Sequence, residues 1–194
     1  CILPNGVCTV FFYCERTVQH FEQLSTEIIH PNPYWHYCHD TYRLPDGSVG
    51  DYYYAHTHGS VIVIPYFENG TFLMVEQYRY LNRRHSLEFP GGGVRRGSTS
   101  EQAAANELQE EAGLQCDTLH KLGEFNPCNG ITDEICTVYM AKDPVTVESS
   151  PDITEQISSI VLDADTLLRY IREGRIWDGA SLSAWTLWNL SYKR

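Results

Sequence analysis

Two short apolar runs, at residues 61–67 and 71–80, form the clearest hydrophobic pattern in the chain. Runs of this length that are rich in β-branched and aromatic residues are typical of buried strands, and the Asn69-Gly70 pair between them favours a tight hairpin turn. Residues 7–57 carry a similar mixture of residues, interrupted by a turn-forming segment at 44–50. We therefore expect a β-rich N-terminal part followed by a hairpin.

Residues 99–112 predict a helix. Its start carries two capping signals of the same spacing: Ser98 with Glu101 fits a capping box, and Thr99 with Gln102 offers a second N-cap. Further strands are expected at 117–124, 135–141 and 157–162, and further helices at 164–173 and 181–190. This order predicts a mixed α/β (α+β) sheet flanked by helices.

Three carboxylates stand near the end of the predicted helix. Glu107, Glu110 and Glu111 are spaced i, i+3 and i+4, so a helix holds them on one side, and Gly113 is placed as the C-terminal cap. Negative charge in the last helical turn is unfavourable to the helix dipole, and the three anions repel one another. Two interpretations stay open: a solvated acidic face, or an oxygen site for a hard divalent cation, Mg²⁺ or Mn²⁺ rather than zinc.

A glycine-rich segment precedes the helix. Gly91, Gly92 and Gly93 follow Pro90, and we expect them to form a backbone turn that side chains would block. Taken together, residues 92–114 resemble the Nudix box, the loop-helix-loop signature of hydrolases that cleave nucleoside diphosphates linked to another moiety. The resemblance implies that the three glutamates bind the metal ion.

The box has two departures from its usual pattern. Ser98 and Asn106 stand where the family has a glutamate and an arginine that pair with each other. Both partners of this structural ion pair are replaced, so neither charge is left without its partner. The set of metal-binding glutamates is intact. The departures keep a second interpretation open, a degenerate non-catalytic module that binds nucleotides or regulates a partner.

Arginines gather around this segment. Five of the 14 Lys and Arg residues lie between Arg79 and Arg96, a span of 18 positions, and we expect Arg79 and Arg84 to bind substrate. The planar guanidinium suits a pair of phosphate oxygens, which favours a diphosphate site over a plain solvated surface.

Composition narrows the choice of partners. The net charge of −11 argues against nucleic acid or an anionic membrane as a partner, and no apolar stretch approaches the roughly 20 residues that cross a bilayer. Seven cysteines without a CxxC pair indicate neither a zinc site nor a disulfide framework, so a cytoplasmic location is expected. The chain begins with Cys1 rather than methionine, and we expect a segment before it.

Residues 30–190 also resemble one branch of the Nudix superfamily, the ADP-ribose and nucleoside diphosphate sugar pyrophosphatases. That resemblance implies an α/β/α sandwich at 58–194 and a small β-rich domain at 1–57 that helps to form a homodimer. It further implies phosphate contact by Arg79, support of the glycine segment by Glu88, and a metal contact from the carbonyl of Gly91. Glu134 is implied as the acidic member of a loop that shapes the substrate pocket.

The implied reaction is attack of water on a phosphorus of a nucleotide sugar, giving a nucleoside monophosphate and a sugar phosphate. The general base is expected in the segment around Glu155, the first choice, with Asp152 as its substitute; a box glutamate, Glu111 or Glu110, is the alternative. An RNA-decapping role is disfavoured because no extended basic track is visible.

Histidines and aromatics of the N-terminal part carry weaker signals. His56 with His58 and His36 with His39 have metal-like spacing, but no third ligand accompanies either pair, so we reject a metal site there. The aromatic residues are expected mainly in the core or an interface, with stacking on a nucleobase as the alternative; they are Tyr34, Trp35, Tyr52, Tyr53 and Tyr54.

Overall fold

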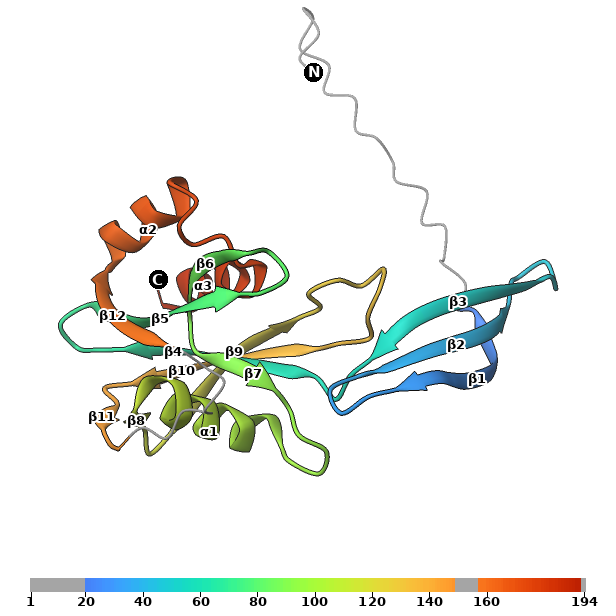
Figure 1. Ribbon diagram of the computed structural model, residues 1–194, viewed down its shortest axis with the longest axis horizontal. Coiled ribbons are helices and arrows are strands. Elements are labelled where there is room, and N and C mark those ends of the chain that lie inside the picture. Colours follow the sequence, from blue (N-terminus) through green and yellow to red (C-terminus); the bar gives the residue numbers. More distant parts are fainter. Residues whose placement is uncertain (1–19, 149–156, 193–194) are drawn as a thin grey trace, which may run out of the picture.

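The computed structural model describes residues 20–148 and 157–192. A three-stranded sheet projects from a larger body in which a second sheet lies between helices (Figure 1). The first sheet is antiparallel in the order β1-β2-β3 and consists of β1 (Glu22–Pro31), β2 (His36–Arg43) and β3 (Val49–His56). Within these strands Cys38 alone is buried, so this sheet has little core of its own.

The second sheet is mixed and has the main order β12-β5-β4-β10-β9. Its strands are β4 (Ser60–Tyr66), β5 (Thr71–Arg79), β9 (Leu119–Phe125), β10 (Cys136–Lys142) and β12 (Ser158–Asp163), and only the pairing of β4 with β10 is parallel. β6 (Arg84–Glu88) pairs with β5, and β7 (Gly91–Gly93) pairs with β4. A separate small sheet joins β8 (Leu114–Gln115) to β11 (Val145–Thr146).

The hairpin of β4 and β5 opens toward one end. Gly70 takes φ +82°, as the tight turn requires, but the two strands pair only at Tyr66 and Phe72. Beyond that point β7 pairs with β4 at Ser60–Ile62, and β6 pairs with β5. The glycine strand β7 is thereby placed at the open end of the central hairpin.

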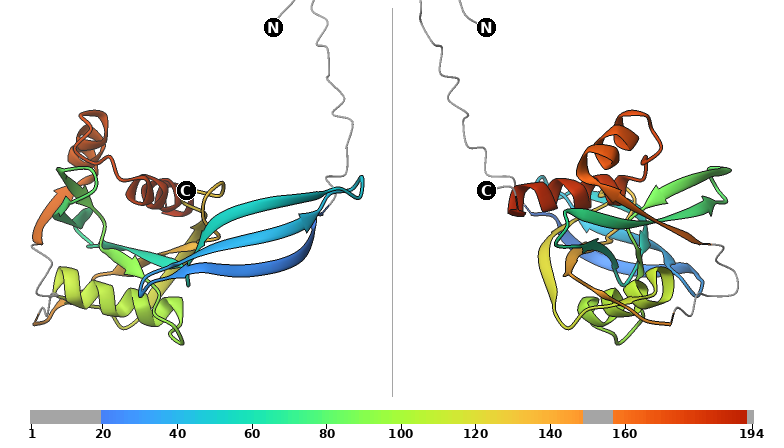
Figure 2. Two further views of the ribbon diagram at one scale, coloured as in Figure 1. Left: turned by 45° about the vertical axis from the view of Figure 1, so that its right-hand side comes forward. Right: turned by 90° about the vertical axis from the view of Figure 1, so that its left-hand side faces the viewer.

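Helices cover both faces of the larger sheet (Figure 2). α1 (Ser100–Ala112) packs on one face, and α2 (Ala164–Arg172) and α3 (Gly179–Tyr192) pack on the other. Successive strand residues point to opposite faces, which divides β4 cleanly: Val61 and Val63 belong to the α1 core, whereas Ile62 and Ile64 belong to the core under α2 and α3. A strand buried on both faces reads as a continuous apolar run, as β4 does.

The predicted fold class, a mixed α/β sandwich with a β-rich N-terminal part, is confirmed. The predicted strands and helices after residue 113 all appear within a few residues of their expected bounds, and β6, β7, β8 and β11 were not predicted. In the described part of the chain, no helix is both long and apolar enough to cross a membrane.

Candidate active site

The ends of α1 are set by side-chain and glycine caps. Thr99 is the N-cap: its Oγ1 accepts a hydrogen bond from the Gln102 amide at 3.2 Å, and the Gln102 side chain accepts one from the Thr99 amide at 3.0 Å. The predicted box at Ser98 and Glu101 is therefore wrong, and its alternative is correct. Gly113 ends the helix in the left-handed region, with φ 61°, as predicted.

The glycine segment is a strand rather than the predicted turn. Gly91–Gly93 pairs with Ser60–Ile62, and none of the three glycines has a positive φ. Glycine is required here by close approach instead: a Cβ on Gly91 would lie closer than 3.0 Å to the Val61 carbonyl oxygen, and one on Gly92 equally close to the Glu107 carboxylate. The turn prediction failed because the strand partner is distant in sequence.

Two box glutamates face this glycine strand. Glu111 is only 7% exposed, and its Oε2 accepts a hydrogen bond from the Gly91 amide at 2.8 Å. The Glu107 carboxylate lies against Gly92. Glu110 is more exposed, and its nearest cation is Arg95, at 4.0 Å from Nη2 to Oε2. The helix spacing thus brings two of the three carboxylates to the backbone of β7.

The donor chemistry around β7 fits a hard divalent cation, since carboxylate and backbone oxygens are its preferred ligands. Across residues 20–148 and 157–192, no group of three or more His, Cys, Asp or Glu side chains is arranged to hold a metal ion. Metal binding by these glutamates and the Gly91 carbonyl stays a prediction.

Arg79 and Glu88 form a two-point ion pair between β5 and the end of β6. Arg79 Nε donates to Glu88 Oε1 at 2.8 Å, and Nη2 donates to Oε2. Glu88 is buried while Arg79 is partly exposed. The hydrogen bonds to Glu88 raise the pKa of Arg79, partial burial opposes them, and the charges of Glu88, Asp178 and Glu111 add to the increase. The guanidinium is therefore held charged in a fixed orientation.

Arg84 lies apart from this pair. Its guanidinium carbon stands 3.6 Å from the centre of the Trp177 ring, a cation–π contact. It is not among the residues that line the cavity described next, so its predicted contact with substrate stays a prediction.

A cavity of about 490 Å³ lies beside the glycine strand. It is lined by residues of β4, β7, the start of α3 and the segment after β9, and the site residues among them are Arg79, Gly91, Gly92 and Glu134. Glu134 accepts a short hydrogen bond from Ser60 Oγ. The structure therefore brings the predicted phosphate-binding arginine, the glycine strand and the predicted acidic loop residue to one cavity.

Some cavity residues were not found from the sequence. Asp178 lies in the wall, and its Oδ2 accepts a hydrogen bond from the Ser181 amide at 2.8 Å, as an N-cap of α3 does. The Asp-x-x-Ser spacing before the predicted helix was the available signal. Phe125 also lines the cavity and carries no such signal, whereas Asn126 begins the loop, residues 126–134, that the resemblance implies for the substrate pocket.

Other predicted residues lie elsewhere. Asp152 and Glu155 fall outside the described residues. Tyr34 and Trp35 are exposed at the turn between β1 and β2 and do not line the 490 Å³ cavity. His56 bonds to Asp133 rather than to a second histidine.

Comparison with known proteins places this arrangement in a family. The NUDIX domain model matches residues 56–181, more than half of the chain. The chain belongs to the NUDIX domain family. Membership agrees with the predicted Nudix hydrolase, an enzyme acting on phosphoric anhydrides, and two of the relatives described next are ADP-ribose pyrophosphatases.

The sequences of three curated relatives align with more than half of this Nudix chain. The methanol dehydrogenase activator of Bacillus methanolicus is 32% identical, over 75% of this chain and 80% of that protein. An ADP-ribose pyrophosphatase of Mycobacterium tuberculosis is 33% identical, over 62% of this chain and 59% of that protein, and one of Bacillus subtilis is 26% identical, over 73% and 78%. A solved structure described as an ADP compounds hydrolase has a TM-score of 0.78 at 16% identity, covering 92% of this chain and 97% of its own, which shows the shared fold.

Proposed function

We propose that this Nudix hydrolase cleaves the diphosphate bond of ADP-ribose or a related nucleoside diphosphate sugar, with Mg²⁺ as its cation and Mn²⁺ as a substitute. The products are a nucleoside monophosphate and a sugar phosphate. The observation that carries the proposal is the single cavity in which Arg79, the glycine strand and Glu134 meet beside the box glutamates. The two ADP-ribose pyrophosphatases among the relatives support the same substrate class.

Each site residue has a proposed role in the reaction that follows from its chemistry. Arg79 binds a phosphate oxygen through Nη1, which makes no hydrogen bond within the described part of the chain, while Glu88 fixes the other two guanidinium nitrogens. Glu107, Glu110, Glu111 and the Gly91 carbonyl would hold a divalent cation, which would neutralise phosphate charge and lower the pKa of the attacking water. Glu111, Glu155 and Asp152 are the proposed general bases, and the position of Glu111 beside Gly91 favours it among the described residues.

The rest of the cavity suits the other parts of a nucleotide sugar. Phe125, Pro127 and Ala180 supply apolar wall for a base or the face of a sugar ring. Asn126 and Asp178 supply amide and carboxylate oxygens that accept hydrogen bonds from sugar hydroxyls.

We also propose a homodimer formed through residues 1–57, with 58–194 as the hydrolase domain. The three-stranded sheet exposes large apolar side chains, including Ile28 at 52%, Tyr53 at 52% and Tyr34 at 85%. Such a surface on a sheet with little core is typical of an interface. Light scattering after gel filtration tests the dimer, and a monomer at micromolar concentration would contradict it.

The four described cysteines are free, which supports a reducing compartment and the proposed cytoplasmic location.

The alternative is a module that binds nucleotides or regulates a partner without hydrolysis. The relative named as a methanol dehydrogenase activator and the replacements at Ser98 and Asn106 favour it. Calorimetry with ADP-ribose and Mg²⁺ separates the two: binding heat without product over a day supports the module, and sustained heat with product excludes it.

The direct test is release of AMP from ADP-ribose with Mg²⁺, run beside GDP-mannose, UDP-glucose and a diadenosine compound. Glu107→Gln and Glu111→Gln are expected to lower turnover about a hundredfold or more, because each removes a charge beside β7. Glu101→Gln, an exposed change in the first turn of α1, is the matched control. No turnover on any nucleotide sugar would reject the proposal, and equal rates for wild type and both box variants would reject the assigned site.

A further inference from the structure

The loop between β9 and β10, residues 126–135, contributes to the cavity from both of its ends. Asn126 and Pro127 line the cavity at the start of the loop, and Glu134 lines it at the end. The middle of the loop contacts β3 instead. The Ala55 amide donates to the Ile131 carbonyl at 2.9 Å, and the Tyr52 hydroxyl donates to the Gly130 carbonyl at 3.2 Å. One loop therefore joins the cavity to the three-stranded sheet.

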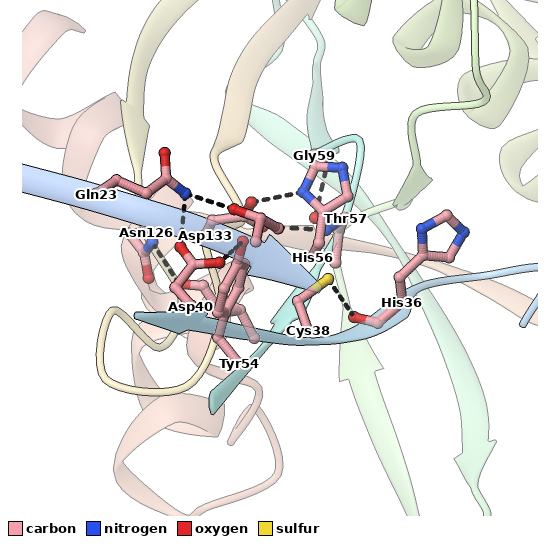
Figure 3. A network of polar contacts seen from close by, with 12 residues as sticks. Gln23, His36, Cys38, Asp40, Tyr54, His56, Thr57, Gly59, Asn126 and Asp133 are labelled. Carbon is pink, nitrogen blue, oxygen red and sulfur yellow. Dashed lines mark hydrogen bonds and ion pairs between the residues drawn. The ribbon is translucent and has the colours of Figure 1, made fainter. Parts of the chain in front are cut away.

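Asp133 connects the loop to the end of β3 through both oxygens of its carboxylate. One carboxylate oxygen, Oδ2, accepts a hydrogen bond from His56 Nδ1 at 2.6 Å, and the other, Oδ1, accepts one from the Thr57 amide at 3.0 Å (Figure 3). His56 is the last residue of β3, and β4 begins at Ser60, so Asp133 binds the short connection between the two sheets. Both oxygens of one carboxylate are used to hold the loop in place.

The loop is also braced internally. The Asn126 side chain donates to the Thr132 carbonyl at 3.3 Å and accepts from the Cys128 amide at 2.8 Å. Glu134, which follows Asp133 directly, is fixed by Ser60 Oγ. Because these bonds tie the cavity residues to the loop, a shift of the loop away from β3 moves Asn126 and Glu134 together.

We infer that Asp133, acting with His56, is a positioning residue for substrate binding: it holds the β9–β10 loop on the end of β3 so that Asn126 and Glu134 face the bound nucleotide sugar. The inference rests on the proposed function for its kinetic consequence. Its structural consequence, an ordered loop, is independent of activity. Asp133 itself does not line the 490 Å³ cavity and is assigned no contact with substrate.

The test compares three variants at this junction with a matched control. Asp133→Ala removes both contacts, Asp133→Asn keeps an acceptor for the Thr57 amide, and His56→Ala removes one contact. Asp51→Ala is the control, because Asp51 forms the same kind of pair with His39, at 2.8 Å, within the three-stranded sheet. Hydrogen exchange of residues 126–135 and steady-state kinetics with ADP-ribose are measured for each.

In Asp133→Ala we expect loop amides to exchange about tenfold faster, with β4 and β10 unchanged, and KM to rise about tenfold with kcat altered less than about threefold. His56→Ala changes both quantities in the same direction, Asp133→Asn lies between wild type and Asp133→Ala, and Asp51→Ala matches wild type. Unchanged loop exchange in Asp133→Ala overturns the inference, as does an equal change in Asp51→Ala.

If wild type hydrolyses no nucleotide sugar, the proposed function fails, and loop exchange alone decides the inference. If Asp133→Ala does not fold, Asp133→Asn and His56→Ala decide it by the same readouts.

Discussion

Arg79 and Glu88 are joined by two hydrogen bonds between partners of very different exposure. The Glu88 side chain is 3% exposed and that of Arg79 is 44% exposed, so a buried carboxylate holds a cation at the cavity wall. Two contacts fix the plane of the guanidinium as well as its position. For the proposed substrate, this arrangement means that Arg79 meets a phosphate oxygen without reorganisation.

Arg79→Lys tests this relationship. Lysine keeps the positive charge beside Glu88 but cannot make two parallel hydrogen bonds, so we expect kcat/KM for ADP-ribose to fall about tenfold to a hundredfold. Arg175→Lys is the control, because Arg175 pairs more loosely with Glu76, at 3.9 Å. Equal kinetic effects of the two changes would show that the geometry at Arg79 is unimportant.

Gly92→Ala should impair activity more than stability. The added Cβ would collide with the Glu107 carboxylate, which is the movable end of a side chain, so the glutamate shifts while the fold is retained. We expect kcat/KM to fall about a hundredfold and the melting temperature to change by less than about 4 °C. Gly93→Ala, with no atom within 4 Å of the new Cβ, should behave as wild type. Parallel losses of turnover and melting temperature in Gly92→Ala would contradict the explanation.

Thr99→Ala should destabilise the protein by about 1 kcal/mol, because it removes the N-cap acceptor for the Gln102 amide. Ser98→Ala is the comparison, and it should alter the free energy of unfolding by less than about 0.5 kcal/mol. Urea denaturation measures both. A larger effect at Ser98 would restore the capping box first predicted there.

Cys136 should make stability fall at alkaline pH. Burial raises the pKa of its thiol from 9.0 to about 11 in the folded protein. Between these values the unfolded thiol loses its proton while the folded thiol keeps it, so the unfolded state binds fewer protons and stability decreases as pH rises. The decrease approaches about 1.4 kcal/mol per pH unit for this group. Urea denaturation of wild type and Cys136→Ala from pH 8 to 11 measures the difference, and parallel pH profiles would refute the assignment.

Several features of the site could be predicted from local sequence patterns. The i, i+3, i+4 spacing correctly predicted that Glu107 and Glu111 lie on a common side of one helix, and Gly113 correctly predicted its end. The choice between Ser98 and Thr99 was not settled by spacing, since each has a carboxyl or amide side chain three residues later. It depends on which residue leaves the helical region of φ and ψ, and here that residue is Thr99.

Other features could not be predicted from local patterns, because they depend on contacts between residues that are distant in sequence. Gly91–Gly93 became a strand because Ser60–Ile62 offers a free edge, and pairing over that distance is invisible to a turn pattern. His56 and Asp133 lie 77 residues apart, and neither has a local signal for the other. Asp178 reaches the cavity only because α3 packs against the sheet.

The sequence alone indicated the family, through the resemblance of residues 92–114 to the Nudix box. It also determined the helix that carries the glutamates and the two-faced character of the central strands, since these two features depend on short-range periodicity. Tertiary structure decided which face of the glycine strand meets which carboxylate, that Arg79 rather than Arg84 lines the cavity, and how the β9–β10 loop attaches to β3. Those outcomes depend on which backbone edges pair and which side chains are excluded from water, and such long-range contacts have no counterpart in a local pattern.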